Sequence, residues 1–105
     1  MNTEQDRTKY IEALESRLRE WQKKIEQLRI SIESADPEQR PRLQRLIAEL
    51  EDQRRTVEVR LEELRAFTRL RWRDLQENVE RARHELEVAL DDARSKAAEL
   101  DERND

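Results

Sequence analysis

Few residues of this 105-residue chain are of types that catalyse reactions or bind ligands. Its only histidine, His84, has Glu80, Glu87 and Asp91 within seven residues of it. On a helix these spacings bring imidazole and carboxylate groups onto neighbouring positions, where they can hold a cation. Transition-metal sites normally gather three or more well-placed ligands, so we interpret this group as a solvated helix face and expect no metal or other cofactor.

A second cluster has an aromatic ring among cations, because Arg69, Arg71 and Arg73 surround Trp72. Such a cluster can hold a nucleic-acid backbone and stack a base, or anchor a helix at a membrane surface. Four carboxylates flank it, however, and the net charge of the chain is −4. A salt-bridged helix surface is therefore favoured, and a weak nucleic-acid binder through Arg69–Arg73 is kept as an alternative.

Signatures of enzymes and of secreted proteins are missing from the sequence. It has no glycine, so it lacks the Gly-rich loops of phosphate- and dinucleotide-binding enzymes, and it has no cysteine for disulfides or thiolate metal sites. The polar residues 1–10 do not resemble a signal peptide, and no stretch approaches the roughly 20 apolar residues of a membrane-spanning helix. We therefore expect a cytoplasmic protein that is not an enzyme.

The composition is 46% charged and 34% hydrophobic, with only 4% aromatic residues. This balance is typical either of disorder or of long helices, and the spacing of the apolar residues decides between them. In the first predicted helix, from about residue 3 to 34, the apolar residues between Ile11 and Ile32 step by three and four without a break. The positions are Ile11, Leu14, Leu18, Trp21, Ile25, Leu28 and Ile32. This heptad pattern predicts a helix with one narrow stripe that packs on a partner helix.

The one clear interruption covers residues 35–41. Asp36 before Pro37 is a suitable N-cap with proline at the first helical position, and Gln39 completes a capping-box pattern. Pro41 would then remove a hydrogen bond in the second turn, which predicts an irregular start to the next helix.

A second helix is predicted over about 42–103, a range without proline or glycine. Its early stripe contains Leu43, Leu46, Leu50, Gln53 and Val57. After Val57 several apolar residues recur every eleven positions, namely Leu64, Leu75, Leu86 and Ala97. Such a repeat favours nearly straight packing over a left-handed supercoil.

The two predicted helices fit one another as a single all-α domain, a long antiparallel coiled-coil hairpin. With a turn near residues 37–38, almost every apolar layer of the first helix meets one in the second, and only Trp21 meets the polar residues Gln53 and Arg54. The second helix then extends more than thirty residues past the first. The alternative is a three-helix bundle with a turn at 67–74, but that segment has no glycine, proline or good cap sequence.

The extension carries an apolar stripe, and an amphipathic helix of this kind is marginally stable alone in water. Pairing with a second copy is favoured, because the polar face is acidic and interfacial membrane helices usually carry basic ones. Membrane-surface binding is kept as an alternative. For Trp72 an interface and an intramolecular core are equally favoured. The residues that we predict to make interactions are Trp72, Leu75, Val79, Leu86 and Leu90, with Arg69, Arg71 and Arg73.

Two parts of the chain have a recognisable pattern. The first is residues 9–14 with Leu18 and Trp21, and the second comprises 61–65, 72–75 and 79–82. Together they resemble small bacterial coiled-coil stress-response proteins found in cyanobacteria and proteobacteria. The resemblance covers about residues 9–97, and the spacing of the two tryptophans is its most specific element. It implies a role in stress response and transfers no catalytic or ligand-binding residue. Where many members have small or glycine residues, this chain has Phe67–Arg71.

Overall fold

The computed structural model of the chain describes residues 4–66 and 72–103, and it consists of helices in both ranges. The three helices are α1 (Glu4–Glu33), α2 (Arg40–Ala66) and α3 (Trp72–Arg103). The expectation of an all-α protein is therefore confirmed.

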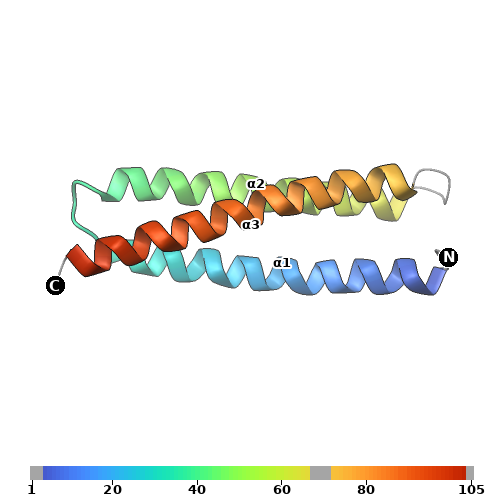
Figure 1. Cartoon of the computed structure of the whole chain (residues 1–105), viewed down its shortest axis with the longest axis horizontal. Helices are drawn as coiled ribbons and strands as arrows, with labels where there is room; N and C mark the ends of the chain where they lie inside the picture. Colours follow the sequence, from blue (N-terminus) through green and yellow to red (C-terminus); the bar gives the residue numbers. More distant parts are fainter. Residues whose placement is uncertain (1–3, 67–71, 104–105) are drawn as a thin grey trace.

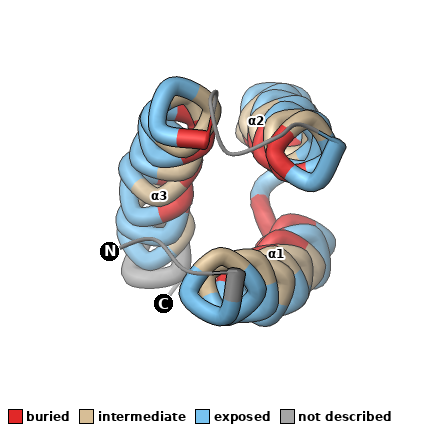
Figure 2. Tube along the Cα trace, turned by 90° about the vertical axis from the view of Figure 1, so that its right-hand side faces the viewer, coloured by how far each residue is buried: buried red, intermediate tan, exposed pale blue. Residues whose placement is uncertain are grey.

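The helices form an elongated bundle in which the chain runs along the long axis three times (Figure 1). Helices α1 and α2 are antiparallel, and α3 returns parallel to α1. The Cα atoms extend 53 × 18 × 15 Å. Seen end-on, α1, α2 and α3 surround a common centre, and their buried residues face it (Figure 2). Helix α3 packs more extensively on α2 than on α1.

The favoured expectation of one continuous helix over 42–103 is corrected by this arrangement, which fits the alternative of a three-helix bundle. Helix α2 ends at Ala66, and α3 begins at Trp72 and packs back on both earlier helices. A continuous helix would leave the stripe of α3 in water, whereas the bundle buries Val79 and Leu86 completely. Burial of apolar surface stabilises by about 25 cal/mol per Å², so packing outweighs the missing turn signal. The predicted turn lies largely outside the described residues.

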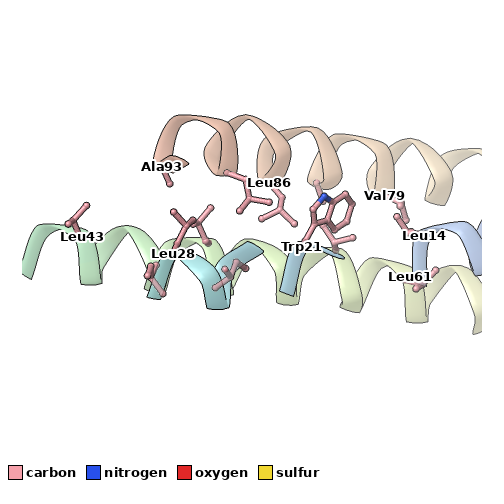
Figure 3. Close-up of a cluster of buried hydrophobic side chains, with 14 of the residues drawn as sticks. Leu14, Trp21, Leu28, Leu43, Leu61, Val79, Leu86 and Ala93 are labelled. Carbon is pink, nitrogen blue, oxygen red and sulfur yellow. The ribbon is translucent and has the colours of Figure 1, made fainter. Parts of the chain in front are cut away.

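The core consists of layers to which all three helices contribute. Leu14 and Trp21 of α1, Leu61 of α2 and Leu86 of α3 are each at most 4% exposed. The indole ring of Trp21 points from α1 toward α3, where Val79 and Leu86 lie (Figure 3). The heptad stripe of α1 therefore serves two partner helices rather than one.

The connection between α1 and α2 explains how the chain accommodates Pro41. The amides of Gln39 and Arg40 both donate to the Asp36 carbonyl, at 2.9 and 3.1 Å, and form a turn before α2 begins at Arg40. Pro41 consequently falls in the first turn of the helix, where main-chain amides have no intrahelical acceptor. The Arg40 guanidinium donates to the carbonyls of Glu33 (3.4 Å), the last residue of α1, and of Ala35 (3.2 Å) in the connection that follows it.

Candidate interaction surface

Trp72, the first residue of α3, is held by two side chains of α1. The Arg7 guanidinium carbon lies 4.5 Å from the centroid of the indole ring. The Tyr10 ring meets it edge-on, with centroids 5.9 Å apart and an interplanar angle of 76°. Cation–π and edge-to-face contacts are both favourable to an indole ring. Trp72 is 4% exposed, so the structure places it in the intramolecular core.

The Tyr10 hydroxyl extends this contact by donating a hydrogen bond of 2.9 Å to the Glu80 carboxylate of α3. Burial raises the pKa of the Tyr10 phenol well above its ordinary value of 10.0, and the hydrogen bond to Glu80 raises it further. Both effects act in this direction because they disfavour a phenolate, by removing water and by placing a carboxylate beside it. Tyr10 therefore joins α1 to α3 as a neutral donor.

Ion pairs continue the α1–α3 contact one heptad further along. Arg83 pairs with Glu80 at 3.5 Å and with Glu87 at 2.8 Å, and Glu87 also lies 3.8 Å from Arg17 of α1. The hydrogen bond from Arg83 to Glu87 raises the pKa of the guanidinium, so Arg83 stays protonated. These exposed or half-buried pairs contribute little stability each, but they define which faces of α1 and α3 meet.

The apolar residues predicted to make intermolecular contacts lie in the core of one chain. Val79 and Leu86 are fully buried, Leu90 is 3% exposed, and Leu75 is partly buried against the same cluster. The predicted partner for this stripe was a second copy, on the ground that the tail had no internal partner. In the structure α1 and α2 supply that partner.

The arginine cluster is only partly visible. Arg69 and Arg71 lie outside the described residues, while Arg73 is exposed at the start of α3. Among the described residues, a cation that packs on Trp72 is Arg7 of α1, which the sequence reasoning did not place there.

The two polar side chains that were predicted to face Trp21 each have a buried atom without a hydrogen-bond partner among the described residues. These atoms are Gln53 Oε1 and Arg54 Nε. Arg54 still reaches Glu58 with its Nη1 atom at 2.9 Å. Gln53 occupies a stripe position of α2 and leaves an unsatisfied carbonyl oxygen beside the core.

His84 is exposed, and two of the carboxylates near it have other partners, since Glu80 binds Tyr10 and Arg83 while Glu87 binds Arg83 and Arg17. In residues 4–66 and 72–103 no group of three or more histidine, cysteine or acidic side chains is placed to hold a metal ion. Within the same ranges no helix has the length and apolar character needed to cross a bilayer.

A hollow of about 470 Å³ lies beside the turn that joins α1 and α2. Its floor includes Ile32 and Ile47, and Arg29, Arg40 and Glu51 stand around it. These charged groups are already engaged, because Arg29 pairs with Glu51 and Arg40 binds the carbonyls at the end of α1. Both arginines that line the hollow are therefore engaged within the chain.

The contacts of Arg7, Tyr10 and Arg17 with α3 were missed by the sequence reasoning. Tyr10, the only tyrosine, and Arg17 are one heptad apart, as are their partners Glu80 and Glu87. This matching spacing was the available signal, but it becomes meaningful only when α3 is known to return parallel to α1.

Comparisons of the chain with protein-family models, curated proteins and solved structures find no match.

Proposed function

We propose that the chain is a non-enzymatic interaction protein, a helical rod that acts through its surfaces and pairs with a second copy by exchanging α3. The observation that carries the proposal is the burial of the α3 stripe against α1 and α2. Among the described residues, the large exposed apolar side chains are Ile30, Val59 and Val88, one on each helix. Such isolated side chains are ordinary on protein surfaces and make no apolar patch.

Exchange of α3 fits these facts because each core contact of α3 is then formed with the other chain instead of within one chain. A dimer through the C-terminal half needs the α3 stripe, and the stripe is occupied within each chain. If α3 of each copy packs on α1 and α2 of the other, the buried surface stays the same. Exchange of an identical element is a low-cost route to a dimer. The sequence from Arg42 to Asp105 contains no proline or glycine that would oppose a longer helix in the exchanged form.

Mixed single-cysteine chains test the proposal, because the natural chain has no cysteine. Arg17→Cys and Glu87→Cys replace exposed partners that lie side by side on α1 and α3. The two variants are unfolded together, refolded, and treated with a short bismaleimide. Exchange predicts a covalent dimer in the mixture that exceeds the dimer formed by either variant alone.

Sedimentation equilibrium supplies the decisive second measurement. A monomer at tens of micromolar with full helicity, and no excess crosslinking in the mixture, would refute self-association. The double variant Arg17→Cys/Glu87→Cys, crosslinked within one chain, is the matched control. It should remain a helical monomer, because α3 can no longer leave its own α1.

A role in stress response, which the sequence resemblance implies, is the cellular setting that we propose for this interaction protein. Equal survival of heat and oxidative stress by cells with and without the chain would count against that setting and leave the exchange experiment unaffected.

A further inference from the structure

Two polar contacts between α1 and α3 have the same spacing in the sequence. Tyr10 binds Glu80 and Arg17 pairs with Glu87, and both pairs are 70 residues apart in the sequence. The two pairs are separated by one heptad on each helix, as expected for parallel helices that meet along one stripe. The same spacing applied once more leads to Lys24 on α1 and Arg94 on α3.

At this third position two cations line one hollow, in place of a donor and a carboxylate. Lys24 and Arg94 both line a hollow of about 220 Å³ between α1 and α3. The other lining residues are Gln27, Leu28, Ser31, Ala97 and Ala98, so no described carboxylate lines it. The carboxylates one turn away, Glu20 and Asp91, do not line it either. Within the described part of the chain, Lys24 and Arg94 form no ion pair.

We propose that this hollow binds a phosphate group. Two adjacent cations repel one another, and an anion between them removes that cost. A phosphate carries a charge of roughly −1.5 to −2 near pH 7, enough to balance both cations, whereas a carboxylate balances only one. The guanidinium provides a planar fork of donors for phosphate oxygens and the ammonium a point charge.

The neutral lining residues refine the class of ligand. The Gln27 side-chain amide is a further donor, while the Ser31 hydroxyl already donates to the Gln27 carbonyl at 3.0 Å. Leu28, Ala97 and Ala98 give the hollow an apolar wall. That wall suits the carbon body of a phosphomonoester, so free phosphate and a phosphomonoester share the chemistry that the site recognises.

Thermal unfolding followed by circular dichroism tests the proposal at constant ionic strength, with sodium chloride exchanged for inorganic phosphate or for phenyl phosphate. Saturating ligand should raise the Tm by about 5 °C, because a ligand that binds only the folded state stabilises it. A higher Tm with both probes assigns the site to phosphate in general, and a higher Tm only with phenyl phosphate assigns it to phosphomonoesters. An unchanged Tm with both probes would overturn the proposal.

Substitutions separate binding from the general stabilising effect of phosphate salts. Lys24→Gln/Arg94→Gln should lose the response, whereas Lys23→Gln/Arg81→Gln, which changes the net charge equally at exposed positions outside the hollow, should keep it. Equal responses in both double variants would show that phosphate acts only as a salt and would overturn the proposal.

One further variant tests whether the site exists because residues 24 and 94 are both cations. Arg94→Glu places a carboxylate opposite Lys24 and completes a third attractive pair. It should raise the Tm in chloride and remove the dependence on phosphate. A lower Tm in chloride together with an unchanged phosphate response would contradict the proposed juxtaposition of residues 24 and 94.

Discussion

Trp72 shows how one side chain can serve either an interface or a core, and its surroundings decide between them. It is 4% exposed and is covered by Arg7 and Tyr10. Replacement of a buried tryptophan by alanine costs about 3–5 kcal/mol, so Trp72→Ala should lower the free energy of unfolding by about 3 kcal/mol or more.

Urea unfolding measures this change, and Ile30→Ala at an exposed position is the matched control, with an expected effect within about 0.5 kcal/mol. A Trp72→Ala protein that keeps its stability but loses self-association would instead place Trp72 at an interface.

Tyr10 makes a prediction about pH, because its pKa is raised above the ordinary 10.0. The neutral phenol is favoured in the folded state, so the stability from Tyr10 is fully present below about pH 10 and is lost as the pH rises above it. Tyr10 is the only tyrosine, so phenolate absorbance follows it directly. In the folded protein the phenolate absorbance should appear at a higher pH than in the urea-unfolded chain.

The two causes of the shift can be separated with Glu80→Gln. This variant should move the titration of Tyr10 only part of the way back, because burial is the larger cause. Identical titrations of folded and unfolded protein would contradict both the partial burial of Tyr10 and its hydrogen bond to Glu80.

Replacement of Gln53 is expected to increase the stability of the protein rather than lower it. Its Oε1 atom is buried without a hydrogen-bond partner, and an unsatisfied buried polar atom costs about 1–3 kcal/mol. Gln53→Leu should therefore raise the free energy of unfolding by about 1 kcal/mol in the same urea assay. Thr56→Leu, at an exposed position of α2, should not give this gain.

At the scale of the helices, the end of α1 depends on an arginine from α2. Arg40 donates to the carbonyls of Glu33 and Ala35, which have no further amides of α1 to bind them. Arg40→Ala should destabilise the bundle by about 1 kcal/mol, the usual contribution of one hydrogen bond. The exposed Arg42 is the matched control, and equal effects of Arg40→Ala and Arg42→Ala on urea unfolding would refute a capping role for Arg40.

Local patterns predicted helix content better than they predicted helix partners. The unbroken heptad of Ile11 to Ile32 is a property of one segment, and it shows directly that this segment is helical and needs a partner. It does not say that Trp21 points toward α3 instead of α2. The return of α3 depended on the apolar surface that the bundle buries, and no glycine, proline or cap marked it in the sequence.

Local patterns in the sequence also failed to identify the contacts of the candidate site. His84 and the arginine cluster attracted attention because their residues are adjacent in the sequence. The contacts between α1 and α3 in the structure join residues that are far apart in the sequence, such as Tyr10 and Glu80, which are 70 positions apart. Helical spacing supplies the heptad interval, but the offset between α1 and α3 follows from the length of α2 and its connections.

For the whole molecule, the bundle and the expected long hairpin differ most in length. The Cα atoms of the bundle extend 53 Å, whereas a continuous helix over 42–103 would extend roughly 90 Å at 1.5 Å per residue. Small-angle X-ray scattering from a dilute sample should give a maximum dimension close to the shorter value. A dimension near the longer one in a monomeric sample would contradict the closed bundle.

The odd number of helices has a consequence for connectivity. Helix α1 begins at one end of the bundle and α3 ends at the opposite end (Figure 1). A two-helix hairpin returns the polypeptide to where it started, but this fold does not. Domains fused before α1 and after α3 would be held at opposite ends of a rod whose Cα atoms extend 53 Å, so the bundle would work as a spacer of fixed length.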